Sequence, residues 1–251
     1  MQCTRAADVE NFDNYLMPVP NWHAVGENIQ YLAAMGVTSY FGESDHGAGH
    51  IAEMNELRAW VEASMMFNST MDPNQLVDEF VLNFYGRVAH PHVMAHMDGW
   101  ERSLQSVKNW TAALAHGGFV ECGNDPLIHP GNCYDQPWVT VEPALNSAAE
   151  LNAALVALRG AGVMGTTYAS RVEKALMSSW WVLLMRWEEA CTFATRERVA
   201  WPLHSNMSVA LAEWVAAAAR QQIDKVCNGI PGFTVNQSYA DTSTAGKVCH
   251  A

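Results

Sequence analysis

Positive charge is scarce in this sequence of 251 residues. It has 14 Lys and Arg against 26 Asp and Glu, a net charge of −12, and no run of basic residues. Nucleic acids and anionic membrane surfaces are bound through a basic footprint, so the composition argues against both as partners. No apolar run approaches the roughly 20 residues that span a bilayer. The longest, WWVLLM at 180–185, ends at Arg186.

Several signature motifs of enzymes are missing as well. The sequence has no G-x-S-x-G, no P-loop and no G-x-G-x-x-G, so neither a hydrolase triad nor a nucleotide site is supported. It also has no C-x-x-C and no H-E-x-x-H. His92 and His96 are four apart on a predicted helix, but zinc requires three or four convergent ligands. We therefore expect no metal, no organic cofactor, and histidines that are solvated.

The six cysteines, in contrast, are even in number and widely spaced. Cys122 and Cys133 flank a loop rich in Pro and Gly, and Cys227 and Cys249 flank the C-terminal tail. Both spacings suit disulfides that fix loops, which form in oxidising compartments. The alternative is a cytosolic protein with buried free thiols.

Four N-x-S/T sequons also favour a secretory route; they begin at Asn68, Asn109, Asn206 and Asn236. The N-terminus has no apolar segment of the kind found in signal peptides. Either the chain is intracellular, or its natural N-terminus is absent from this sequence.

The first 70 residues predict a helix, a strand, a loop and a second helix. The helix covers 25–36 and ends at Gly36, and the strand covers 37–43, which is rich in β-branched and aromatic residues. The second helix covers 50–67, with apolar residues three to four apart. This order is typical of an α/β protein with a parallel sheet.

From residue 71 the pattern becomes helical. Asp72 and Pro73 form a helix start, and Gly86 a stop. Further helices are predicted at 88–116, 143–160, 166–197 and 205–227. Trp180, Trp187 and the leucines between them are expected to pack in the core. We predict an all-α bundle over 71–227 and an irregular tail over 228–251.

Four stretches, NYLMPVPNW, GVTSYFGES, FNSTMDPNQLVDEFVLNFYG and RVEKALMSSWWVLL, follow one another in an order that resembles the C-terminal part of proteins with the domain of unknown function numbered 4838 (DUF4838). Those proteins look like glycoside hydrolases related to α-glucuronidases and hexosaminidases. The resemblance covers residues 12–100 and, less closely, 143–195. It implies a mainly α chain in which residues 1–70 are the last βα unit or units of a (β/α)8 barrel. The helical domain follows this part of the barrel, and the resemblance implies that the chain is a fragment of a longer protein.

In such a barrel the reactive groups lie at the carboxyl ends of the strands. Glu43 ends the predicted strand, so the resemblance makes it a candidate catalytic acid or base, or a ligand of sugar hydroxyls. Asp45 and His46 follow on the next loop. Capping of the following helix is the alternative for this cluster.

The proline-stiffened segment before the first helix is the second part of the predicted site. Tyr15 and Trp22 offer aromatic faces for sugar rings, and Asn21 offers an amide. Packing and helix capping are the alternatives for these residues.

The resemblance therefore implies a glycoside hydrolase-like protein that acts on or binds glycans at the barrel mouth. One strand cannot build that mouth, so the isolated chain is expected to be inactive. The alternative is a non-catalytic helical module that binds carbohydrate or serves a structural role as a glycoprotein. The sequence leaves the oligomeric state open.

Overall fold

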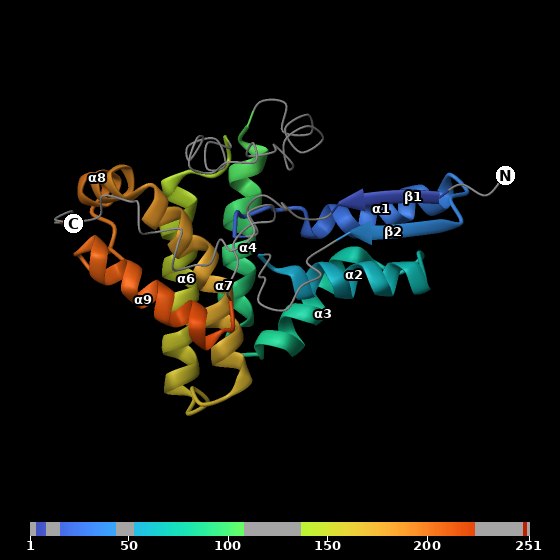
Figure 1. Ribbon diagram of the computed structural model, residues 1–251. Helices are drawn as coiled ribbons and strands as arrows, with labels where there is room; N and C mark the ends of the chain where they lie inside the picture. The colour runs from blue at the N-terminus through green and yellow to red at the C-terminus, as the bar shows by residue number, and fades with distance from the viewer. Residues whose placement is uncertain (1–3, 9–15, 44–52, 108–136, 224–247, 250–251) are drawn as a thin grey trace.

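The computed structural model describes residues 4–8, 16–43, 53–107, 137–223 and 248–249 (Figure 1). The fold of these residues is mainly helical, as predicted. They form two strands and eight helices, in the order β1 (Thr4–Asp8), α1 (Trp22–Ala34), β2 (Ser39–Glu43), α2 (Asn55–Phe67), α3 (Pro73–Tyr85), α4 (His90–Gln105), α6 (Val141–Gly160), α7 (Thr167–Met185), α8 (Trp187–Glu197) and α9 (Met207–Arg220). None of these helices is long and apolar enough to cross a membrane.

Strands β1 and β2 form a parallel pair joined by α1, which makes a βαβ unit. The register runs from Thr4 opposite Ser39 to Asp8 opposite Glu43. The parallel sheet was predicted, but β1 was not, because TRAAD has neither alternation nor β-branched residues other than its first. The described residues hold two strands, so they provide no evidence of a closed barrel.

Helix α2 covers one face of this sheet. The Tyr40 hydroxyl donates a hydrogen bond of 2.7 Å to Glu62 on α2. Gly42, two residues further along β2, lies so close to the same carboxylate that a Cβ would collide with it. Phe41, which alternates with them, is 59% exposed. One face of β2 is therefore covered by α2, and the other carries an exposed aromatic ring.

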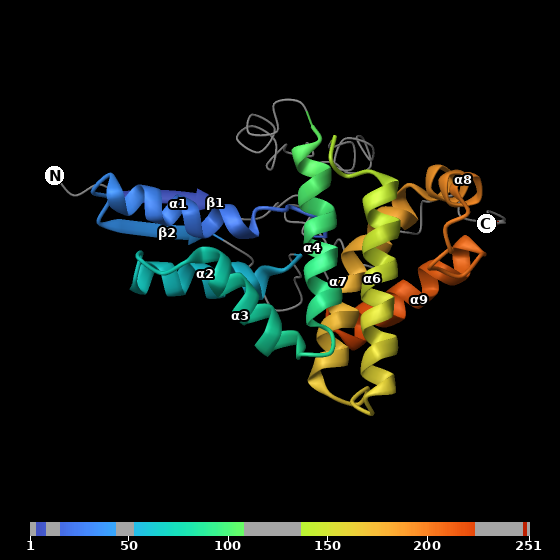
Figure 2. The same ribbon diagram turned by 180° about the vertical axis from the view of Figure 1, so that it is seen from behind.

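The helical part is built around α4, α6 and α7, which run side by side in both views (Figures 1 and 2). Their facing sides carry buried apolar residues, among them Trp100, Leu151 and Val182. Helix α9 packs against α7, where the rings of Trp181 and Trp214 have centroids 5.0 Å apart. One continuous core joins α4, α6 and α7 to α1, α2 and α3, and the boundary at residue 70 remains a prediction.

Local signals set the ends of α3 as predicted. The Asp72 side chain accepts a hydrogen bond of 2.9 Å from the Asn74 amide, and Gly86 ends the helix at φ +84°. The single helix predicted over 166–197 is wrong. It divides at Arg186, which leaves helical geometry at φ −109° and ψ 36°. There its guanidinium bonds the Val139 carbonyl and lies 2.9 Å from Glu189.

The structure corrects the predicted pairing of Cys249. Its disulfide partner is Cys191 on α8, with Cα atoms 5.5 Å apart, and not Cys227. Cys249 reaches α8 because its amide bonds the Ser205 carbonyl at 2.7 Å, beside the bridge between Asn206 and Val248. The other predicted disulfide cysteines, Cys122, Cys133 and Cys227, lie outside the described residues.

Candidate functional site

The carboxyl ends of β1 and β2 lie at one edge of the sheet, because the strands are parallel. This edge points toward the helical bundle in both views (Figures 1 and 2). Asp8 and Glu43 are the last residues of the two strands and are register partners. The pairing thus brings two acidic residues next to each other where the sequence predicted one. Asp8 was missed because β1 was missed.

The other predicted sugar-contacting residues fall into two groups. Tyr15, Asp45 and His46 lie outside the described residues. Asn21 is the N-cap residue of α1, but its side chain does not cap the helix; its Oδ1 accepts a hydrogen bond of 2.7 Å from Arg58 Nε. Trp22 is 2% exposed, with the Arg58 guanidinium 5.9 Å from the ring centroid. Core packing is thus the role seen for Trp22, and its contact with sugar remains a prediction.

The segment 16–21, which leads into α1, is irregular and largely buried. Buried carbonyl groups need partners, and three side chains that are distant in the sequence supply them. Ser178 on α7 donates to the Leu16 carbonyl at 2.7 Å, and Trp138 donates to the Pro18 carbonyl at 3.0 Å. Arg58 Nη2 on α2 donates to the Val19 carbonyl at 2.7 Å. This segment is therefore fixed to both parts of the molecule.

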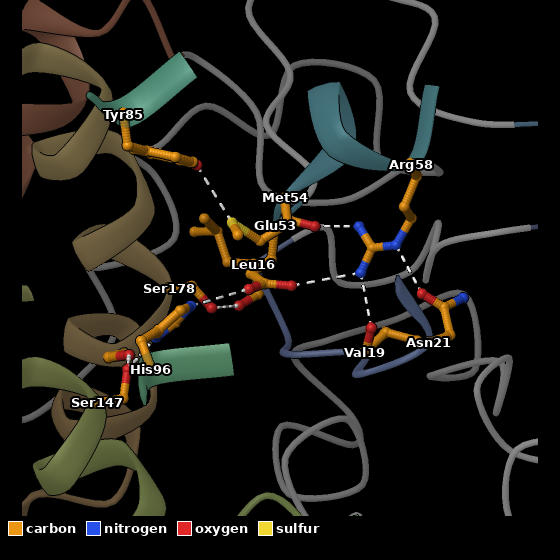
Figure 3. Close-up of polar contacts among 11 residues, drawn as sticks. Leu16, Val19, Asn21, Glu53, Met54, Arg58, Tyr85, His96, Ser147 and Ser178 are labelled. Carbon is orange, nitrogen blue, oxygen red and sulfur yellow. Dashed lines mark hydrogen bonds and ion pairs between the residues drawn. The ribbon is translucent and has the colours of Figure 1, made fainter. Parts of the chain in front are cut away.

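Arg58 is also the end of a buried polar network (Figure 3). Its Nη2 lies 3.3 Å from Glu53 Oε2, and Glu53 Oε1 lies 3.4 Å from His96 Nε2 on α4. His96 Nδ1 is 2.5 Å from the Ser147 hydroxyl on α6, which in turn bonds the Ser179 hydroxyl on α7. The network therefore connects the residues before α2 to three helices of the bundle.

These charges are withdrawn from water: the side chains of Glu53 and Arg58 are 1% exposed and that of His96 is 0% exposed. The prediction of solvated histidines is therefore wrong for His96. An ion pair at such depth requires nearly full satisfaction of its hydrogen bonds, since desolvation opposes it. Arg58 meets this need with four acceptors.

Sequence reasoning missed Glu53, Arg58 and the two serines. Charged residues on an amphipathic helix usually face water, so Arg58 carried no signal. Ser147 did carry one, because it occurs three residues after Ala144 and four before Leu151, within an apolar stripe.

The order of carboxylate, imidazole and hydroxyl in Glu53, His96 and Ser147 is that of an acyl-transfer triad. The surroundings do not suit that chemistry. Ser147 is 2% exposed, so a substrate cannot reach its hydroxyl. It lies within α6, where backbone N–H groups bond inside the helix and cannot form an oxyanion hole. We therefore interpret the network as a structural support.

Three side chains, Tyr40 on β2, Glu62 on α2 and Tyr85 on α3, have displaced pKa values. Burial raises the pKa of Glu62, although the hydrogen bond from Tyr40 and the charge of Arg58 oppose the shift. Burial and the Glu62 carboxylate raise the pKa of Tyr40. Burial and the charges of Glu56 and Glu53 raise the pKa of Tyr85, whose hydroxyl lies 3.2 Å from Met54 Sδ. These tyrosines stay neutral at physiological pH.

Two of the predicted glycosylation sites can be located. Asn68 is exposed after α2, and its Oδ1 accepts hydrogen bonds from the amide and hydroxyl of Thr70. Asn206 caps α9, accepting a bond of 3.2 Å from the Val209 amide. Asn109 and Asn236 lie outside the described residues. Of the two located asparagines, Asn68 is the more accessible acceptor.

Metal ligands do not converge in this part of the chain: among the described residues, no three His, Cys, Asp or Glu side chains could hold an ion together. Pairs do occur on α4, where His90 lies 2.8 Å from Asp78 and His92 lies 2.9 Å from Glu150. A pair provides too few ligands for zinc.

Comparison with protein families gives a match over part of the chain. Residues 8–98 match a family described as a domain of unknown function (DUF4838). This range includes α1, β2, α2, α3 and the first half of α4, and therefore Glu43, Glu53, Arg58 and His96. The match supports the resemblance to that family and carries no activity with it. No curated protein and no solved structure matches the chain.

Proposed function

We propose that this chain is part of a carbohydrate-active protein of the glycoside hydrolase type, and that the carboxyl edge of β1 and β2 contacts the sugar. The observation that carries the proposal is the register pairing of Asp8 with Glu43 at that edge. Enzymes built on (β/α)8 barrels act at the carboxyl ends of their strands. Glycosidic bonds are usually cleaved by two carboxyl groups on either side of the bond.

The βαβ unit and α2 fit the proposal as the final units of a larger parallel sheet. One face of β2 is covered by α2 and the other carries the exposed Phe41. Parallel sheets normally have both faces covered, so further strands or a partner would be expected over this side. In the proposed role, one carboxyl group protonates the leaving oxygen and the other stabilises or attacks the sugar.

The proposal includes passage through the secretory pathway. The Cys191–Cys249 disulfide supports it, because such bonds persist in oxidising compartments. The exposed sequon at Asn68 is a second support. Mass spectrometry of the protein from a eukaryotic secretory host provides the test. A glycan on Asn68 agrees with the proposal, and a bare Asn68 with free thiols at Cys191 and Cys249 contradicts it.

Turnover of aryl glycosides of glucuronic acid and of N-acetylhexosamines by the proposed longer protein, of which this chain is a part, tests the catalytic part. We expect Glu43→Gln and Asp8→Asn to abolish turnover while the protein remains folded by circular dichroism. Glu213→Gln, at an exposed position on α9, is the matched control and should retain full turnover. Equal turnover in all three variants would remove the strand edge from the mechanism.

A non-catalytic glycan-binding module is the second candidate, favoured by the fact that the described sheet has only two strands. Titration of the same free sugars, followed by NMR, separates the two. Binding that Glu43→Gln weakens, without turnover in the wild type, supports the binding module. Absence of both binding and turnover contradicts both candidates.

A further inference from the structure

The predicted sugar-site residues are distributed over two connections. The first joins β1 to α1 over residues 9–21, and the second joins β2 to α2 over residues 44–54. Of the residues concerned, the structure describes Asn21 and Trp22 at the end of the first connection and Glu43 directly before the second. Any site at this edge depends on how the two connections are held relative to each other.

The Arg58 side chain bonds the final residues of both connections (Figure 3). On the first, Nη2 donates to the Val19 carbonyl and Nε to Asn21 Oδ1, each at 2.7 Å. On the second, Nη1 donates to the Glu53 carbonyl, and Nη2 lies 3.3 Å from Glu53 Oε2. One guanidinium therefore joins two segments that are more than 30 residues apart in the sequence.

We propose that Arg58 is a positioning residue, which holds the described ends of the two connections, residues 16–21 and Glu53, in a fixed relation to each other. This inference rests on the proposed function for its consequence, but its geometry stands independently. A guanidinium is planar and presents five donors in fixed directions, whereas an ammonium is a single point charge. Lysine at this position can therefore keep the charge opposite Glu53 but cannot bond all the acceptors at once.

The helical bundle also contacts both connections and so limits where Arg58 can hold them. Glu53 contacts His96 on α4 at 3.4 Å, and His96 bonds Ser147 on α6. Ser178 on α7 holds the Leu16 carbonyl of the first connection at 2.7 Å. Because these contacts are buried, water does not weaken them. Arg58 is the group that touches both connections directly, and the bundle fixes each of them from the other side.

Amide hydrogen exchange of the whole chain tests this geometry without any sugar. In Arg58→Lys we expect exchange at residues 16–21 and 53–58 to accelerate at least tenfold, while α6 and α7 remain unchanged. Arg220→Lys is the matched control. Arg220 Nη2 on α9 lies 2.5 Å from Glu173 Oε1 on α7, so exchange at residues 16–21 and 53–58 should equal that of wild type in this variant. Unchanged exchange in Arg58→Lys overturns the proposal.

A second variant keeps the test decisive if Arg58→Lys does not fold. Asn21→Ala removes one acceptor on the first connection and leaves the ion pair with Glu53 intact. We expect faster exchange at residues 16–21 and no change at 53–58. Acceleration spread equally over the whole chain would mean general destabilisation and would contradict a positioning role.

If Arg58 had only a structural role, its replacement would leave the sugar affinity unchanged. Sugar affinity is therefore the second quantity to measure. For glucuronic acid and N-acetylglucosamine we expect Arg58→Lys to raise Kd at least tenfold. Leu151→Ala, which removes buried side-chain volume in α6, should lower stability and leave Kd unchanged. An unchanged Kd in Arg58→Lys refutes positioning. If the wild type binds neither sugar, the proposed function fails and the exchange experiment alone decides the role of Arg58.

Discussion

Arg58 Nη2 lies 3.3 Å from Glu53 Oε2, and both side chains are almost completely excluded from solvent. A buried charge that loses its partner is left without compensation, which typically destabilises a protein by about 3–5 kcal/mol. Loss of either side chain should therefore destabilise the N-terminal part strongly. In the sequence, each of the two residues looks like a solvent-exposed charge on a helix.

Removal of one charge of this pair should therefore lower the free energy of unfolding more than removal of both charges. We expect Arg58→Met to lower the free energy of unfolding by about 3–5 kcal/mol. Adding Glu53→Gln to it should recover part of the loss, because no orphan charge remains. Urea denaturation of the wild type, both single variants and the double variant measures the coupling. Additive losses would mean that the two side chains do not interact.

Ser178 should contribute more to stability than another serine of α7. Its hydroxyl satisfies the buried Leu16 carbonyl, so Ser178→Ala leaves that group unpaired and should cost about 1–3 kcal/mol. Ser170 is exposed, with its hydroxyl 3.3 Å from Gln221, and Ser170→Ala should change stability by less than about 0.5 kcal/mol. Thermal or urea unfolding compares them, and equal effects would contradict the role of the Leu16 contact.

Glu62 should make stability depend on pH in the direction opposite to that of most carboxyl groups. Its pKa is raised in the folded protein above the ordinary value of 4.5, so the folded state holds the proton more tightly than the unfolded state. The resulting stabilisation is complete below about pH 4.5 and is lost as pH rises through the folded pKa.

Replacement of this carboxyl by an amide gives the measurement. Glu62→Gln still accepts from Tyr40 but does not titrate, so the wild type should lose stability relative to Glu62→Gln between pH 4 and pH 8. The free energy of unfolding at each pH supplies this difference, with Glu213→Gln as the control at an exposed position. A difference that stays constant with pH would show that Glu62 titrates alike in both states.

The disulfide prediction distinguishes two pairings of Cys249. Cys191→Ser opens a link between residues 58 apart and should cost about 2–4 kcal/mol by increasing the entropy of the unfolded chain. Cys249→Ser should have the same effect, and the double variant should be no less stable than either. Cys227→Ser should differ from both. If Cys227→Ser reproduced the loss and Cys191→Ser did not, the pairing would be Cys227 with Cys249.

Sequence patterns were reliable wherever the determining groups are close in the chain. The start of α3 depends on Asp72 and Asn74, and its end on the positive φ of Gly86. Strand β2 has the composition of a strand, and α6 has an apolar stripe of its own. Such signals act within a few residues, so they can be read without knowledge of the fold.

Tertiary structure alone decided the features whose partners are distant. TRAAD became β1 because β2 pairs with it, and this pairing placed Asp8 opposite Glu43. His96 is buried where folding brings Ser147 to its Nδ1 at 2.5 Å and the Glu53 carboxylate within 3.4 Å of its Nε2. Cys249 pairs with Cys191 because the chain end lies beside α8 and α9. Periodicity predicts which side of a helix is apolar, but a buried polar group is stable only next to a partner that folding brings to it.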